Sequence, residues 1–385
     1  MRMKRVAPIE NDAEQGEDGP DGPAGHSPLA GLYDIARACD HPGPAMSWRH
    51  FSASVRSGSG GERAEAWAAC DSGPINSRPI NGGPINGGPI NDRSINDGHV
   101  DGGEVDGSQV GGDQVGGDQV VGGYVLHFPQ DDNTHLALLR LMTHPGRRRE
   151  GIGGALLDHA IGRARDEGRR VLIAEAPSDG PGTPFAKARG FSPASTETRL
   201  VLDLRTADWS GLELLRARAV RHATDYSLER WAGPTPDDLL GDMARLAEGM
   251  NDEPLGDLAM EDQRWTADRV RAREEMLTRA GQRTYTMIAR CTAGGEPAGF
   301  TQLVVDAERP EGWARQGATT VLAPHRGRRL GLVLKLANIT WFRACEPSVE
   351  RVITWNSVAN PHMLAINEAM GFEVFDTWHQ WQLDI

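Results

Sequence analysis

Two turns that combine arginine and glycine are the parts of this 385-residue sequence best suited to bind an anion. The first runs from Arg148 through Gly151 to Gly153, and the second from Arg326 to Gly331. Each follows a strand-like segment and precedes a helix-like one. The N–H groups at a helix start carry the positive end of the helix dipole, and glycine lets a phosphate come close. Either turn alone also fits a plain strand-to-helix connection.

The elements around the two turns follow the same order, which indicates a duplicated unit. In the first unit we expect helices over 29–39 and 48–55, strands over 64–70 and 120–129, a strand, turn, helix and strand within 135–177, and a closing hairpin over 190–204. In the second we expect helices over 235–250 and 266–281, strands over 283–291, 298–306 and 317–323, the turn with its long helix, a strand over 351–356, a helix over 360–370 and a last strand over 379–385.

The sequence therefore predicts an α/β protein, of the α+β kind, with a mixed and mostly antiparallel sheet flanked by helices. The expected organisation is a disordered segment at 1–28, an N-terminal domain at 29–205, a helical connector at 206–223 and a C-terminal domain at 224–385. A five-residue repeat of Ile or Val interrupts the first domain at 72–119.

Taken together, the turns and their surroundings resemble the GNAT superfamily of acetyl-CoA-dependent N-acetyltransferases, in a tandem form of actinobacterial type. That family binds the CoA pyrophosphate with an Arg/Gln-x-x-Gly-x-Gly/Ala loop, followed by a strand, an Asn-bearing helix and a Gly-Phe strand start. Gly190-Phe191 and Gly371-Phe372 supply the last feature. The resemblance covers roughly residues 60–205, without the repeat, and 224–385, and it implies two tandem GNAT-like domains.

The resemblance also implies acetyl-CoA as co-substrate and assigns residues to it. In the second unit these are Val321, Arg326, Gly327, Arg328, Arg329, Gly331, Leu332, Asn356 and Asn360, and in the first unit Arg148, Gly151 and Gly153. Arg329 stands where the family has its first glycine, unless the motif is shifted to Arg328-x-x-Gly331-x-Val333. Because the second unit keeps Asn360, we expect the chemistry there and a degenerate partner in the first.

Candidate catalytic residues come from two places in the second unit. The family often has a tyrosine that protonates the leaving thiolate, and Asn367 occupies that position here. The stretch 250–265 joins the two helices that frame the acceptor site in this fold, and it is rich in acidic residues. Glu253 or Asp262 could remove the proton of the amine, although a solvated acidic loop is the plainer interpretation.

Composition restricts the partners. The net charge of -13 and a pI near 5.4 argue against a nucleic-acid binder. No apolar run is long enough to span a bilayer, and the four scattered cysteines suggest neither disulfides nor a metal site. We expect a cytoplasmic monomer or homodimer that acts on a small-molecule amine.

The repeat allows a second interpretation of the chain. Its period invites comparison with pentapeptide-repeat β-helices, but glycine or charge stands where that family needs a small inward residue. A disordered, expanded surface loop fits better, because loop length adds closure entropy only slowly. The alternative function is a catalytically inactive CoA-binding or scaffold protein that uses the repeat as its interaction segment.

Overall fold

The computed structural model describes residues 1–6, 27–39, 42–57, 62–71, 119–307 and 311–385. Its strands are β1 (Arg2–Val6), β2 (Arg63–Asp71), β3 (Gln119–Phe128), β4 (Leu136–Thr143), β5 (Val171–Pro177), β6 (Ser192–Asp203), β7 (Tyr226–Ala232), β8 (Gln282–Cys291), β9 (Pro297–Asp306), β10 (Trp313–Val321), β11 (Arg351–Ser357) and β12 (Glu373–Asp384). The repeat predicted as a disordered loop lies outside the described residues, apart from Gln119 at the start of β3.

Helices account for most of the connections between strands. The α-helices are α1 (Pro28–Cys39), α2 (Trp48–Ser57), α3 (Ile152–Asp166), α4 (Gly182–Ala188), α5 (Trp209–Val220), α6 (Leu240–Glu248), α7 (Ala267–Arg279), α8 (Leu330–Cys345) and α9 (Pro361–Ala369). Short 3-10 turns occur at η1 (Pro145–Arg147), η2 (Asp237–Leu239), η3 (Gly249–Asp252) and η4 (Ala323–His325). Helix α5 lies within the stretch expected to be a helical connector.

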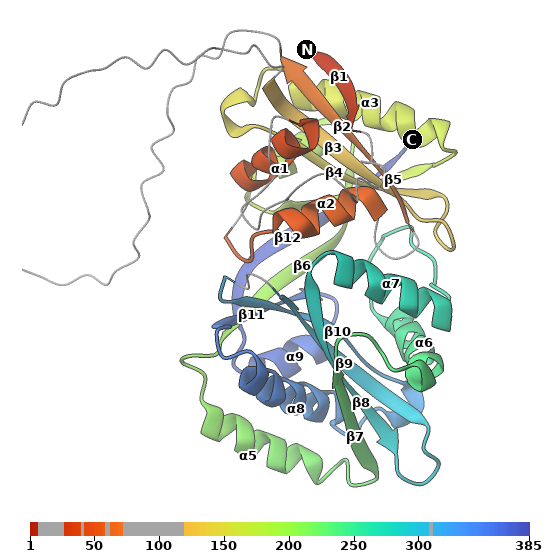
Figure 1. Ribbon diagram of the computed structural model, residues 1–385, viewed down its shortest axis with the longest axis vertical. Coiled ribbons are helices and arrows are strands. Elements are labelled where there is room, and N and C mark those ends of the chain that lie inside the picture. Colours follow the sequence, from red (N-terminus) through yellow and green to blue (C-terminus); the bar gives the residue numbers. More distant parts are fainter. Residues whose placement is uncertain (7–26, 40–41, 58–61, 72–118, 308–310) are drawn as a thin grey trace, which may run out of the picture.

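All twelve strands form one sheet, in the order β1-β2-β3-β4-β5-β12-β6-β11-β10-β9-β8-β7. Neighbours are antiparallel except for β4 with β5 and β10 with β11. The mixed, mostly antiparallel sheet with flanking helices is the predicted fold class. Figure 1 shows the N-terminal half above and the C-terminal half below, with β12 and β6 crossing between them.

The centre of the sheet joins the halves by exchanging their last strands. Strand β6, from the first half, pairs with β11, and β12, from the second half, pairs with β5; the two also pair with each other. The predicted hairpin over 190–204 is therefore wrong, because β6 is one continuous strand. Its middle has no glycine or asparagine that would favour a tight turn, and strands distant in the chain pair with both of its edges.

Hydrophobic packing follows the exchange. Leu200 and Leu202 of β6 are buried in the C-terminal core with residues of α8, whereas Trp381 of β12 is buried in the N-terminal core with residues of α3. Trp381 is only 1% exposed. The domain limits expected from the sequence divide the chain, but they do not divide the sheet.

The N-terminal segment corrects one expectation. Residues 2–6 were predicted to be disordered, but they form β1, which pairs with β2 through its whole length and buries Val6. The segment contains neither glycine nor proline, so it extends the edge of the sheet without a break. Residues 7–26 lie outside the described residues.

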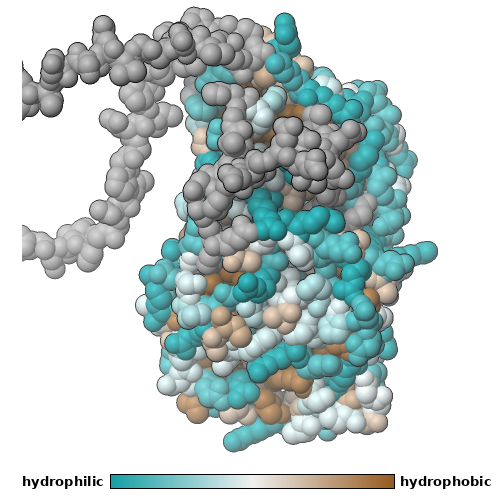
Figure 2. All heavy atoms as spheres, in the orientation of Figure 1, coloured by the Kyte–Doolittle hydropathy of each residue, from teal (hydrophilic) through white to brown (hydrophobic). Residues whose placement is uncertain are grey.

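No helix in the described parts of the chain has the length and apolar character to cross a membrane. Polar side chains cover most of the face in Figure 2, with small hydrophobic patches over the C-terminal half.

Candidate active site

Backbone conformation aligns the two anion-binding turns. In the first, Arg149 and Gly151 have φ values of 69° and 83°, and in the second Gly327 and Arg329 have φ values of 79° and 57°. Gly151 and Arg329 are the N-caps of α3 and α8. This pattern pairs 148–153 with 326–331 and decides against the shifted motif. Arg329 thus adopts a left-handed conformation that normally favours glycine.

Both helix starts have backbone donors available for a ligand. Neither Gly151 nor Arg329 caps its helix with a side-chain hydrogen bond. The first-turn N–H groups of an α-helix have no partner inside the helix, and they attract anions. A Cβ atom at Gly151 or Gly327 would meet nothing within 4 Å, so both turns are open. These features fit the pyrophosphate of CoA.

The arginines of the second turn are held by weak, exposed pairs. Arg326 donates to the Val321 carbonyl at 2.8 Å and pairs with Asp252 in the connection between α6 and α7. Arg328 pairs with Asp225 at 3.4 Å. Exposed ion pairs of this kind contribute about 0–1 kcal/mol. An incoming phosphate can therefore replace the carboxylates at little cost.

The strands that carry these turns separate from their parallel neighbours. Strand β10 pairs with β11 only from Trp313 to Arg315, and β4 pairs with β5 only from Leu136 to Leu139. Beyond those points the facing edges have no strand partner in the described sheet. We call these places the β10–β11 opening (residues 316–321 and 354–357) and the β4–β5 opening (residues 140–143 and 175–177).

The two openings differ in one backbone feature. Strand β10 has a register shift against β9 between Gln316 and Thr319, which inserts one extra residue. Strand β4 pairs with β3 without any such shift. A bulge bends its strand and leaves backbone groups unpaired, as is common beside active sites. The C-terminal half therefore has the more specialised opening.

Two buried amides border the β10–β11 opening. The Asn367 Nδ2 group on α9 donates to Asn356 Oδ1 on β11 at 2.6 Å, and both residues are buried. The Asn367 Oδ1 atom has no hydrogen-bond partner within the described structure. Asn360 caps α9 by accepting from the Met363 N–H at 3.2 Å. An amide does not release a proton at neutral pH, so Asn367 cannot replace the tyrosine as an acid.

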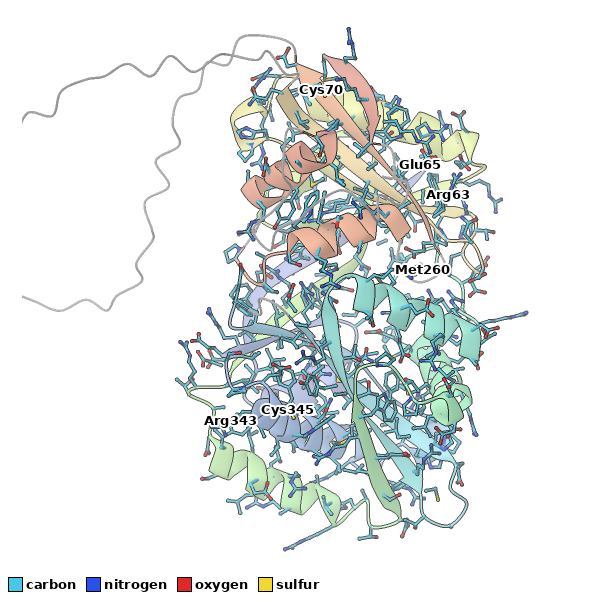
Figure 3. All side chains as sticks on the ribbon, viewed as in Figure 1. Arg63, Glu65, Cys70, Met260, Arg343 and Cys345 are labelled. Carbon is cyan, nitrogen blue, oxygen red and sulfur yellow. The ribbon has the colours of Figure 1, made fainter. Side chains whose placement is uncertain are left out.

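The acidic connection between α6 and α7 crosses to the other half of the molecule. The Asp257 N–H donates to Ala194 at 2.8 Å, and the Glu261 N–H donates to Asn133 at 2.6 Å. Figure 3 shows Met260 of this connection where the two halves meet. The two candidate bases of this connection therefore lie in different surroundings. Glu253 is partly buried, which raises its pKa, whereas Asp262 is exposed near the N-terminal half.

The structure adds two carboxylates that sequence reasoning missed. Glu197 on β6 lies opposite Trp378 and Ser357, and Glu175 on β5 lies opposite Gln380. Burial, together with the carboxylates of Glu175 and Glu253, raises the pKa of Glu197 to about 7. Burial also raises the pKa of Glu175. Neither residue belongs to a motif, so only their shared face on the exchanged strands brings them together.

An arginine and three aromatic rings lie beside these carboxylates. Arg199 is buried, pairs with Asp376 and donates to the Pro42 carbonyl at 3.1 Å. Its guanidinium lies 4.9 Å from the ring centre of Trp378, and the rings of Trp355 and Phe375 are also within 6 Å. Arg199 is thus committed to protein groups.

This sheet, with a glycine-containing turn and a helix start beside an opening between parallel strands in each duplicated half, is that of a two-domain acyltransferase. The chain is similar to a tandem protein of the GNAT superfamily of acetyltransferases, and part of it matches that family's model. The family model for "Acetyltransferase (GNAT) family" matches residues 107–191.

Two solved structures share the fold of this chain. A tandem GNAT protein from the clavulanic acid biosynthesis pathway is 25% identical, with a TM-score of 0.67 over 100% of this chain and 98% of that one. A fungal GCN5-related glucosamine N-acetyltransferase region of a multi-domain β-N-acetylglucosaminidase is 11% identical, with a TM-score of 0.57 over 92% of this chain and 37% of that one. No curated protein matches the sequence.

Proposed function

We propose that the protein transfers the acetyl group of acetyl-CoA to the primary amine of a small molecule, and that the C-terminal half performs the chemistry. The bulge in β10 carries this proposal, because it distinguishes the C-terminal opening from its N-terminal counterpart. The bulge lies between the anion-binding turn and the buried amide pair, where a pantetheine arm would pass.

Residues of the C-terminal half would hold acetyl-CoA along its length. The turn with Arg326, Gly327, Arg328 and Arg329, and the helix start with Gly331 and Leu332, would bind the pyrophosphate. Val321, Asn356 and Asn360 border the path of the pantetheine arm. Bound there, acetyl-CoA supplies the acetyl group as a thioester.

The N-terminal turn remains a second candidate for cofactor binding. Arg148, Gly151 and Gly153 keep the glycine-containing loop, and Gly153 lies against Thr143 and Phe185 much as Gly331 lies against Val321 and Ile366. The β4–β5 opening has no bulge, so we assign this half to binding without transfer.

The chemical step needs a neutral amine and a route for its proton. The amine nitrogen attacks the thioester carbonyl carbon, the C–S bond breaks, and the thiolate leaves with the bonding electrons. CoA thiolate is a fair leaving group, so the absence of the family's tyrosine does not prevent reaction. Asn367 acts through Asn356, which it orients, and is therefore a positioning residue.

Similarity to a tandem GNAT protein from the clavulanic acid biosynthesis pathway supports a small acceptor. The acidic connection between α6 and α7 is consistent with a cationic acceptor. Glu253 is the residue of that connection which borders the β10–β11 opening.

Thermal unfolding of the full chain with and without acetyl-CoA tests the proposal. A ligand at about 100 times its Kd stabilises the folded state by about 2.7 kcal/mol. We expect Arg326→Ala to remove most of that stabilisation, while Arg279→Ala, on an exposed part of α7, leaves it intact. Loss only with Arg148→Ala would move the working site to the N-terminal half. No stabilisation at all would refute the acetyltransferase and favour a scaffold.

A further inference from the structure

Glu197 occupies a position that both halves of the molecule build. It lies on β6, which the first half contributes to the sheet of the second, and its strand neighbours are Trp378 and Ser357. Residues directly opposite each other in a sheet lie on the same face. Gln380, two residues beyond Trp378, donates to Glu197 Oε1 at 3.1 Å. Glu197 is therefore held in one orientation at the centre of the sheet.

The carboxylate borders the proposed reaction site from one side, and Glu253 borders it from the other. Ser357, opposite Glu197, is the last residue of β11 and follows the buried Asn356. Glu253 directly follows η3, where the Gly249 carbonyl accepts from Thr320 Oγ1 on β10 at 2.9 Å. Glu197 on β6 thus lies beside the end of β11, and Glu253 follows a turn that is hydrogen-bonded to β10.

Within the described structure, no cation is paired with Glu197 or Glu253. No hydrogen bond or ion pair to an arginine, lysine or histidine is found for Glu197, Glu253 or Glu175 within the described structure. Arg140 on β4 and Arg199 on β6 act on Glu175 through space and partly offset the rise in its pKa. Among the described residues, the only charges that act on Glu197 are those of Glu175 and Glu253, and both repel it. Arg199 is paired with Asp376 and does not offset that repulsion.

Glu65 shows what the same protein does with a structural buried carboxylate. Burial acts to raise the pKa of Glu65, but hydrogen bonds from Arg163 and Trp67 bring it below 4.5. Arg163 lies 3.0 Å from its carboxylate, and Arg5 and Arg63 are also close. Figure 3 shows Glu65 and Arg63 on the same strand of the N-terminal half. Glu197 has no such partner.

Two further observations point to an organic cation. Glu175 is exposed on the sheet, so a ligand can reach its carboxylate. The described carboxylates do not converge as metal ligands do, since no group of three or more acidic, histidine or cysteine residues is placed to hold a metal ion. A cation with a carbon skeleton satisfies both observations.

We propose that Glu197 binds the ammonium group of the acceptor and removes its proton, and that the acceptor is a cationic amine with no carboxylate beside that amine. This inference rests on the acetyl transfer proposed above. The proton passes from the ammonium nitrogen to the Glu197 carboxylate, which frees the nitrogen lone pair. The nitrogen then bonds to the acetyl carbon, the C–S bond breaks, and the proton lost from the new amide neutralises the thiolate.

The excess of carboxylates defines the acceptor class. A carboxylate adjacent to the amine would face Glu197 and Glu253 at close range, where like charges repel strongly because little solvent screens them. Ornithine is 1,4-diaminobutane with one carboxylate added beside its α-amine, so transfer to that α-amine isolates this effect.

The test compares acetyl transfer to these two amines by the full chain. We expect kcat/KM for the diamine to exceed that for the α-amine of ornithine, read from the acetylated product, by about tenfold or more, equivalent to about 1.4 kcal/mol. Glu197→Gln should lower kcat for the diamine by about 100-fold, a usual contribution of a general base. It should also abolish the rise in kcat/KM with pH through about 7 that the wild type shows. Glu275→Gln, on an exposed part of α7, is the matched control and should change none of these values.

Two results would overturn the inference while leaving acetyl transfer intact: an equal or better rate at the α-amine of ornithine, or a Glu197→Gln variant that keeps the wild-type pH profile. If the wild type binds acetyl-CoA but acetylates neither amine, the proposed transfer to small amines fails. Thermal unfolding with 1,4-diaminobutane alone then decides on the cation site. Stabilisation of the wild type that Glu197→Gln removes supports the site, and its absence in the wild type refutes it.

Discussion

Replacement of Glu197 by glutamine should make the folded protein more stable at neutral and alkaline pH. The folded state keeps this side chain beside Glu175 and Glu253, and burial with that repulsion raises its pKa from 4.5 to about 7. At about 1.4 kcal/mol per pKa unit, the rise corresponds to about 3 kcal/mol. Residual solvent access lowers this ceiling, so we expect the variant to gain about 1–3 kcal/mol above pH 7.

The sign follows from proton binding in the two states. Between pH 4.5 and about 7 the unfolded chain releases the proton while the folded protein retains it. The stabilisation from protonated Glu197 is therefore complete below pH 4.5 and is lost as the pH rises through about 7. Glutamine resembles the protonated acid in shape and has no charge to lose, so Glu197→Gln keeps its stability across this range.

Urea unfolding at about pH 4 and about pH 8.5, read by circular dichroism, measures the effect. The difference in unfolding free energy between variant and wild type should be small at the lower pH and reach its full value at the higher one. Glu275→Gln, in the solvent-exposed part of α7, controls for general charge effects. A difference that does not change with pH would show that Glu197 ionises freely, and the argument for a desolvated carboxylate cluster would fail.

Three other substitutions test separate parts of the structure. Lys335→Met should stabilise the fold by several kcal/mol below pH 7. Burial lowers the lysine pKa from 10.5 to about 7, so below pH 7 the folded wild type must hold a buried charge. Urea unfolding should show this gain in stability disappear near pH 10.5, and a gain that does not change with pH would contradict the prediction. Trp381→Ala should cost about 3–5 kcal/mol and expose the N-terminal core to hydrogen exchange, whereas exchange confined to the C-terminal half would refute the exchanged-strand packing. Arg329→Gly should stabilise the fold by about 1 kcal/mol, because it relieves a left-handed conformation, and it should also weaken acetyl-CoA binding. Arg328→Gly should only weaken acetyl-CoA binding. Scanning calorimetry without acetyl-CoA measures the stability of each variant, and titration calorimetry with acetyl-CoA measures its binding.

Local signals in the sequence were sufficient for most of the elements. The alternation and periodicity of apolar residues predicted helices and strands close to their observed bounds, because each pattern concerns neighbours within a few residues. The order of those elements around two arginine- and glycine-containing turns predicted the duplication and the family. Glu253 was predicted as a candidate base in the same way, since it lies in an acidic stretch between two recognisable helices, and it stays a prediction.

The sequence could not predict which strands pair at the centre of the sheet. Strand β12 is separated from β5 by nearly the whole C-terminal half, and nothing local to Ser192–Asp203 shows that it completes the other unit's sheet. The predicted hairpin failed for that reason. The sequence also could not decide between the 326–331 motif and the motif shifted to Arg328. Only the left-handed backbone conformation of Arg329 identifies it as the counterpart of Gly151.

The sequence by itself thus determined the kind of protein, its duplicated elements and the turns that can hold a phosphate, because these depend on short-range patterns of residue type. The tertiary structure alone decided the charge environment of the site. Glu175, Glu197 and Glu253 are far apart in the chain. The exchange of β6 and β12 places Glu175 and Glu197 on one face of one sheet, where the charge of Glu253 also acts on Glu197. A carboxylate's pKa depends on what surrounds it in space, and that information is absent from its neighbours in sequence.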